Sequence, residues 1–169
     1  MNFFWLFIAL VIFQRAVELI IAKRNELSLK ELGAREVDRK GYRIIVAIHV
    51  AFFFLLIFEW TLLKRSLNPL WAVFLLIFAA AQILRYWAIT SLGIYWNTKI
   101  IVAPEHPLIK SGPYKFLRHP NYVAVVTELA VVPLIFSCYL TAAVFTLLNA
   151  FVIRRRIRIE TAALTHEES

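Results

Sequence analysis

Residues 42–63 read YRIIVAIHVAFFFLLIFEWTLL, an almost unbroken apolar run. As an α-helix rising 1.5 Å per residue, it is about 33 Å long, enough to cross the hydrocarbon core of a bilayer. Phe3–Ala22 and Leu70–Leu92 are apolar runs of similar length. The whole chain is 61% hydrophobic and only 18% charged, a balance that indicates lipid as the solvent. We therefore expect three transmembrane helices within residues 1–92.

A fourth apolar region, Tyr122–Ile153, is too long for one span and short for two. Pro133 and the pair Ser137-Cys138 interrupt it, so we expect two short helices that form a hairpin over residues 120–153. The fold class is then an all-α integral membrane protein with about five transmembrane helices. Residues 93–169 form the second part of the chain, made of a long loop, the hairpin and a basic tail.

Basic residues are concentrated at one end of these helices. Fifteen of them fall in loop 23–43, loop 93–118 and the tail, whereas the opposite side carries only Lys64 and Arg65. The positive-inside rule predicts an N-terminus outside the cell and a C-terminus in the cytoplasm. We expect a multi-pass protein of the cell membrane whose active site faces the cytoplasm. The net charge of +8 then needs no nucleic-acid partner.

Few residues are available for the common cofactor motifs. Four glycines cannot form a G-x-G-x-x-G or Walker loop, so any bound nucleotide is held in another way. Cys138 is the only cysteine, which excludes an intramolecular disulfide. No metal site is expected.

The segment Gly112-Pro-Tyr-Lys-Phe-Leu-Arg-His-Pro-Asn-Tyr122 lies where a polar loop re-enters the membrane. Pro120 suits the first turn of the fourth helix, with His119 near the cap. The free N–H groups of such a helix start attract a carboxylate or another anion. The alternative is a basic membrane-entry loop in which Arg118 contacts lipid phosphates.

The tail sequence Arg154-Arg-Arg-Ile-Arg-Ile-Glu160 follows the last apolar residues. It is typical of a basic cluster that fixes orientation. However, Arg156 precedes Glu160 by four residues, the weaker order for helix support, which hints at another role. Ionisable residues also occur inside the spans, and for most of them we expect structural contacts within the bundle; they are Arg15, Glu18, His49, Glu59, Arg85 and Glu128.

The combined pattern His106-x-Leu-x-x-x-Gly-x-Tyr-x-x-x-Arg-His-Pro-x-Tyr122, followed by Arg156-x-x-x-Glu160, resembles the isoprenylcysteine carboxyl methyltransferase family. The resemblance implies an integral membrane O-methyltransferase that uses S-adenosylmethionine without a Rossmann domain. It makes residues 93–169 the catalytic region, made of a cofactor loop, the hairpin 120–153 and a cytoplasmic tail. It assigns Arg156 the catalytic role of orienting the acidic oxygen of the substrate. The residues that it assigns to the cofactor are His106, Leu108, Ile109, Tyr114, Arg118, His119, Pro120, Asn121, Tyr122 and Glu160.

Two positions depart from the family pattern. Thr161 follows Glu160 where a second glutamate is common, and Lys99 replaces a polar uncharged residue. The short chain is similar to small bacterial members that methylate alkylpyrones beside a type III polyketide synthase, which makes an alkylpyrone-type enol the expected substrate.

Several alternatives stay open at this point. One is carboxyl methylation of an isoprenylcysteine-like substrate, and another is phospholipid N-methylation, for which Arg156 is a poor partner. A sterol-type reductase that uses NADPH and a non-enzymatic membrane scaffold complete the set.

Overall fold

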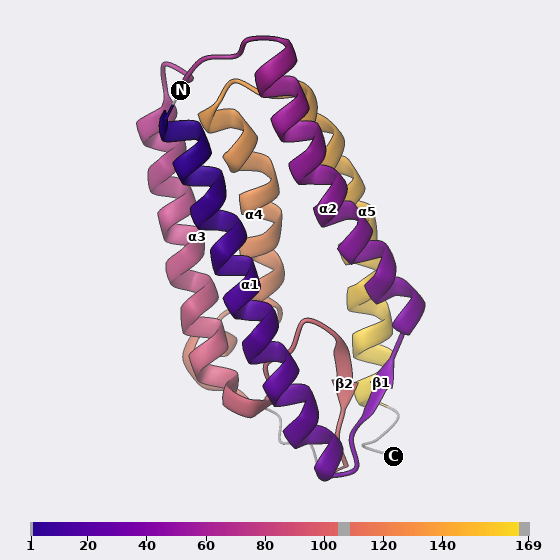
Figure 1. The fold of residues 1–169 in the computed structure, drawn as a ribbon. Coiled ribbons are helices and arrows are strands. Elements are labelled where there is room, and N and C mark those ends of the chain that lie inside the picture. The colour runs from indigo at the N-terminus through magenta and orange to yellow at the C-terminus, as the bar shows by residue number, and fades with distance from the viewer. Residues whose placement is uncertain (1, 105–108, 166–169) are drawn as a thin grey trace.

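The computed structural model describes residues 2–104 and 109–165. Five α-helices, two short strands and two 3₁₀ turns follow one another along the chain (Figure 1). The helices are α1 (Asn2–Glu31), α2 (Arg39–Leu62), α3 (Trp71–Leu92), α4 (Pro120–Ile135) and α5 (Tyr139–Thr165). The remaining elements are β1 (Arg35–Val37), η1 (Gly93–Tyr95), β2 (Ile100–Val102) and η2 (Gly112–Lys115).

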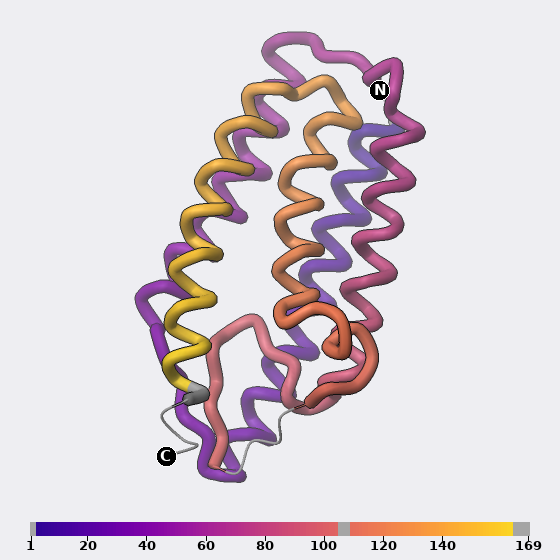
Figure 2. The backbone as a smooth tube through the Cα atoms, turned by 180° about the vertical axis from the view of Figure 1, so that it is seen from behind, coloured from indigo at the N-terminus to yellow at the C-terminus, as the bar shows by residue number. Residues whose placement is uncertain are grey.

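The helices form two groups that meet at one end of the bundle. Helices α1, α3 and α4 lie together, and α2 runs beside α5 on the other side (Figures 1 and 2). At the end near the N-terminus, aromatic rings join the groups: Phe4 stacks on Trp60 with centroids 4.5 Å apart and meets the edge of Phe136 at 4.9 Å. Toward the other end the groups separate, and the two strands and the loops lie between and below them.

Three of the helices confirm the predicted membrane spans by length and composition, namely α1, α2 and α3. Their large apolar side chains point outward, as Phe54 and Leu76 show with exposed fractions of 72% and 71%. Such surfaces are stable in lipid rather than in water. Helix α4 is also apolar but shorter. A five-span count and the orientation of the chain remain predictions.

The predicted hairpin forms, but its turn lies beyond Pro133. Helix α4 continues through this proline to Ile135, and the chain reverses at 136–138, where Ser137 has a φ of 56°. Pro133 has no N–H to donate to the carbonyl four residues before it, but only two helical residues follow it, so the interruption disturbs little of the helix. The N–H of Cys138 instead bonds to the Pro133 carbonyl at 2.9 Å.

The segments at the end of the bundle that carries the two strands are more ordered than the sequence suggested. Helix α1 extends to Glu31, so the first part of the expected loop 23–43 is helical, and α5 carries the expected tail as helix to Thr165. An antiparallel ladder pairs β1 with β2 in the register Arg35↔Val102, so the chain is not purely helical. This ladder joins the loop between α1 and α2 to the segment that leads into the candidate site.

Candidate active site

The start of α4 has the predicted geometry. Pro120 is the first helical residue, and His119 is the N-cap, with no hydrogen bond from its side chain to the helix. The turn η2 delivers the chain to this point, and Gly112 in it has a φ of 57°. A β-carbon at Gly112 would overlap the side chain of Ser91 on α3, so the close approach of loop and helix requires glycine.

Tyr122 connects two predicted site residues of α5. The Arg156 Nε donates to the Tyr122 hydroxyl at 2.8 Å, and that hydroxyl donates to Glu160 at 2.5 Å. The ring of Tyr122 stacks on His119 with centroids 5.2 Å apart, and the His119 Nδ1 lies 3.7 Å from Glu160. The structure therefore brings together His119, Tyr122, Arg156 and Glu160, which come from two helices.

Arg156 is fixed on two sides and open on a third. Besides its bond to Tyr122, its Nη2 donates to the Thr98 carbonyl just before β2, at 2.6 Å. The residue is only 7% exposed. Its Nη1 makes no hydrogen bond to the residues that the structure describes. A buried cation that is held at two nitrogens and open at the third has the form of an anion-binding group.

A pocket of about 250 Å³ opens beside Arg156 between the two helix groups. Most of the surface that its lining residues present to the pocket is apolar, which suits a lipophilic ligand. The apolar lining comprises Leu19, Ile45, Val46, Val50, Phe53, Val125 and Ile153. The polar and aromatic lining comprises Arg15, Glu18, Tyr42, His49, Arg85, Trp96, Asn97, Thr98, Asn121, Tyr122, Asn149 and Arg156.

Near the Arg156 end of the pocket, two lining side chains each have a buried polar atom that lacks a hydrogen-bond partner among the described residues. The indole Nε1 of Trp96 donates to none of the described residues, and the amide Oδ1 of Asn121 accepts from none of them. Native proteins rarely leave such atoms unpaired, because burial without a hydrogen bond is costly. Both atoms therefore point to a ligand with polar groups of its own.

The other predicted cofactor residues lie at varied exposure. Tyr114 is half-buried, and burial, together with the Glu160 carboxylate, raises the pKa of its hydroxyl. The hydroxyl is thus a donor at neutral pH. Ile109 is half-buried, Pro120 is buried, and Arg118 is exposed to the surroundings. His106 and Leu108 lie outside the described residues. The cofactor roles of all of these residues remain predictions.

Lys99 has a structural explanation. Its Nζ lies 3.0 Å from Glu26 of α1 and 3.2 Å from Glu36 of β1, and 5.4 Å from the ring centroid of Tyr42. Partial burial disfavours the ammonium, but the two carboxylates outweigh that effect and raise the pKa of Lys99. The departure from the family pattern at this position thus builds an ion-pair bridge between α1, β1 and β2.

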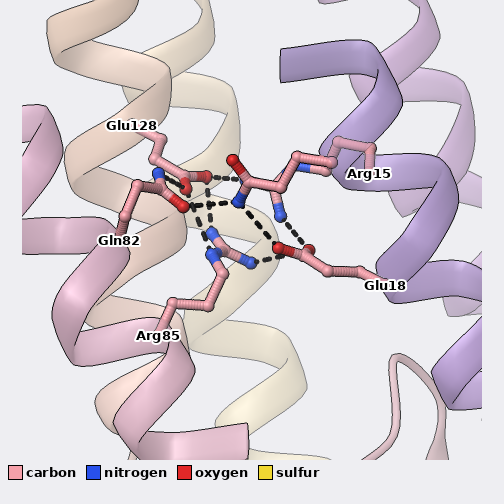
Figure 3. Close-up of polar contacts among 6 residues, drawn as sticks. Arg15, Glu18, Gln82, Arg85 and Glu128 are labelled. Atoms are coloured by element: carbon pink, nitrogen blue, oxygen red, sulfur yellow. Dashed lines mark hydrogen bonds and ion pairs between the residues drawn. The ribbon is translucent and has the colours of Figure 1, made fainter. Parts of the chain in front are cut away.

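A second polar cluster lies deeper in the bundle (Figure 3). Arg85 of α3 donates to Glu128 of α4 at 2.5 Å and to Glu18 of α1 at 3.3 Å. Arg15 bonds to the same two carboxylates, and Gln82 donates to Glu128. Each of the two guanidinium groups therefore meets both carboxylates, which confirms the expectation of bundle-facing contacts.

Glu59 confirms that expectation at the opposite end of the bundle. Its carboxylate accepts hydrogen bonds from the N–H and the hydroxyl of Thr141, at 2.8 and 2.7 Å, and lies 3.2 Å from Arg65. It satisfies the first N–H groups of α5, a structural role. Sequence reasoning missed the pocket residues Thr98 and Asn149. For Asn149 a signal existed, because it stands seven residues, or two helical turns, before Arg156.

Comparison with known proteins gives a consistent result. The sequence model of the isoprenylcysteine carboxyl methyltransferase family matches residues 72–166, from α3 to the end of the chain's last helix. A Bacillus subtilis protein named uncharacterized protein YpbQ is 43% identical over 161 residues, which cover 95% of this chain and 96% of that protein. An uncharacterized protein of Haemophilus influenzae is 30% identical, over 90% of this chain and 89% of its own. No solved structure matches significantly.

Proposed function

Because the chain belongs to the isoprenylcysteine carboxyl methyltransferase family, we propose that it is a membrane O-methyltransferase that uses S-adenosylmethionine to methylate a lipophilic acid or enol. Family membership supports the cofactor and the general reaction. The observation that carries the choice of an acidic oxygen is Arg156, whose guanidinium is fixed by Tyr122 and Thr98 with Nη1 open beside an apolar pocket.

The residues around α4 suit the chemistry of S-adenosylmethionine. The Glu160 carboxylate can accept from the ammonium group of its methionine end, and the start of α4 near His119 attracts the carboxylate. The buried Asn121 Oδ1, which lacks a partner among the described residues, can accept from a further donor of the cofactor. The hydroxyl of Tyr114 adds a hydrogen-bond donor.

The chain's own residues then have to align an acidic oxygen. When bound, S-adenosylmethionine supplies an electrophilic methyl group and keeps the electrons of the broken bond on its sulfur. Arg156 holds the substrate's oxyanion through Nη1, so the substrate arrives ionised and no dedicated base is needed. Tyr122 and Thr98 keep the guanidinium from turning, and such alignment lowers the barrier by several kcal/mol. The apolar pocket walls keep water away from the reacting pair.

An alkylpyrone-type enol is the acceptor that we favour. Its acidic oxygen suits Arg156, its greasy chain suits the pocket, and the unpaired Trp96 Nε1 can donate to a second oxygen of the ring. A type III polyketide synthase would supply such a molecule. An isoprenylcysteine carboxylate shares the charge and the amphiphilic character and is the second candidate. The distribution of basic residues supports a site on the cytoplasmic side, where the cofactor would be available.

Calorimetric titration of the detergent-purified chain separates the reaction classes. We expect S-adenosylhomocysteine to bind and NADP not to bind. If only NADP binds, the methyltransferase assignment is wrong and the chain is instead assigned as a sterol-type reductase. Failure of both to bind would favour a non-enzymatic scaffold.

A further inference from the structure

The pocket has polar side chains at two depths. Arg156 and Tyr122 lie at its cytoplasmic end, as assigned above. Farther along, His49 of α2 and Asn149 of α5 face the same pocket, next to Arg15 of the charged cluster. No role in binding S-adenosylmethionine or the acidic oxygen accounts for this second set.

Helix registers place the second set at one level. Phe4 of α1 stacks on Trp60 of α2, and the two helices run in opposite directions. Arg15 stands eleven residues after Phe4, and His49 stands eleven residues before Trp60. Arg15 and His49 therefore lie at the same depth in the bundle. Phe52 of α2 meets Phe145 of α5 with centroids 5.4 Å apart. His49 stands three residues before Phe52, and Asn149 stands four residues after Phe145. Because α2 and α5 run in opposite directions, His49 and Asn149 lie at nearly the same depth.

On the walls formed by α5, α2 and α4, apolar side chains separate the two polar depths, while Glu18 of α1 and Arg85 of α3, which are paired with each other, line another wall. Asn149 and Arg156 lie on one face of α5, seven residues and hence about 10 Å apart. Ile153 stands between them on that face, with Ile45 of α2 and Val125 of α4 on the facing walls. A ligand that fills the pocket thus meets a polar group, an apolar stretch and a polar group again.

The second set leaves hydrogen-bonding capacity unused. Asn149 is 4% exposed, yet its Nδ2 donates to none of the described residues. The Nδ1 of His49 lies 2.8 Å from the Ile45 carbonyl, an acceptor, so Nδ1 carries the proton and Nε2 is an acceptor. That Nε2 has no hydrogen-bond partner among the described residues. By contrast, the neighbouring Arg15 is engaged by Glu18 and Glu128.

We infer that His49 and Asn149 form a second subsite that binds a hydroxyl group on the chain of the methyl acceptor. A hydroxyl donates one hydrogen bond and accepts another, so it can donate to the His49 Nε2 and accept from the Asn149 Nδ2. A charged group does not fit, because these two side chains are neutral and the neighbouring Arg15 is already paired with Glu18 and Glu128. The inference rests on the proposed function and narrows its substrate to an amphiphile hydroxylated about 10 Å from the methylated oxygen.

The test compares two probes that differ in this hydroxyl alone. Both are 4-hydroxy-2-pyrones with saturated chains of equal length, and one carries a hydroxyl about 10 Å from the 4-oxygen. Affinity is measured by tryptophan fluorescence on the full chain in detergent, since Trp96 lines the pocket. Transfer of a labelled methyl group is measured separately. The variants are His49→Leu and Asn149→Leu, with the exposed Leu147→Ala of α5 as the matched control.

We expect the wild-type chain and the control to bind the hydroxylated probe about fivefold more tightly, the value of one net hydrogen bond. Either leucine variant should bind the two probes equally. Equal affinities in the wild-type chain, or a preference that survives in both variants, would overturn the subsite. A preference without methyl transfer would leave the subsite standing and remove the proposed reaction. Methyl transfer without a preference for the hydroxylated probe would overturn the subsite and leave the proposed reaction standing. If neither probe binds, both the subsite and the proposed reaction are overturned.

Discussion

Two polar clusters of the bundle are built from the same residue types, and they differ in one respect. In the deep cluster, the guanidinium groups of Arg15 and Arg85 meet the carboxylates of Glu18 and Glu128, so each charge has opposite partners. In the cluster around Arg156, Arg156 and Glu160 share only the Tyr122 hydroxyl among the described residues, and the Arg156 Nη1 has no hydrogen bond to any of them beside the pocket. The first cluster is closed, because every charge in it is paired, and it joins helices. The cluster around Arg156 is open, because one nitrogen is left for a ligand.

Breaking the closed cluster should have the largest effect. Arg85→Leu leaves Arg15 as the single cation facing Glu18 and Glu128, and removal of one partner from a buried ion pair typically costs about 3–5 kcal/mol. We expect a large drop in the thermal unfolding temperature in detergent.

The double variant Arg85→Leu/Glu128→Leu serves as the control for that loss. It removes one charge of each sign and should recover much of the stability, because Arg15 and Glu18 still neutralise each other. A double variant that is no more stable than Arg85→Leu would show that packing, rather than charge balance, makes this cluster structural.

Removing a charge from the cluster around Arg156 should affect binding before stability. Glu160→Ala removes the carboxylate that we assign to the ammonium group of the cofactor. A hydrogen bond to a charged group is worth about 1.5–3 kcal/mol, so the affinity for S-adenosylhomocysteine should fall about tenfold to a hundredfold. Titration calorimetry measures it. An unchanged affinity with an unchanged unfolding temperature would contradict the assignment.

The shared hydroxyl should matter less than either charge. Tyr122→Phe removes one of the two groups that hold Arg156 and should reduce turnover about fivefold to tenfold, the effect of one hydrogen bond. Tyr139→Phe, at the far end of the bundle, deletes a hydroxyl that accepts only from Asn68 among the described residues and should leave turnover unchanged. If the two variants behave alike in a methyl-transfer assay, Tyr122 does not position the arginine.

The smallest effect concerns an ion pair at the surface. The Arg155 guanidinium bonds to Asp38, the N-cap of α2, and lowers the pKa of that carboxyl although partial burial opposes it. Because the pKa of this carboxyl is lower in the folded state, the ion pair stabilises the protein fully at a pH above the unfolded-state pKa of about 3.9. This stabilisation is lost as the pH falls through the folded-state pKa. Asp38→Asn should therefore lower the unfolding temperature by about 2 °C at neutral pH. The difference from wild type should vanish in acid.

The sequence predicted the membrane helices better than the loops that join them. Unbroken apolar runs specify α1 to α3, and Pro120 marks the start of α4. The extension of α1 to Glu31 had a local signal, because Lys23 and Lys30 flank Glu26 at helical spacing and both reach it. The β1–β2 ladder had none, since its three-residue strands depend on two distant loops meeting.

The site was predictable in its residue types but not in its connections. The spacing of Arg156 and Glu160 showed that they share a helix face, yet the hydroxyl between them belongs to another helix. The second anchor of Arg156 is the main-chain carbonyl of Thr98, which no side-chain motif reveals. The pocket depends on how the two helix groups separate, a property of packing over the whole bundle.

The loss of Arg156 tests most directly whether this residue orients the substrate. We expect Arg156→Ala to lower transfer of a labelled methyl group to a 4-hydroxy-2-pyrone at least about a hundredfold, as expected when a group that orients charge in the transition state is removed. The affinity for S-adenosylhomocysteine should change little by comparison. Turnover close to that of the wild-type chain would contradict the central role of this arginine.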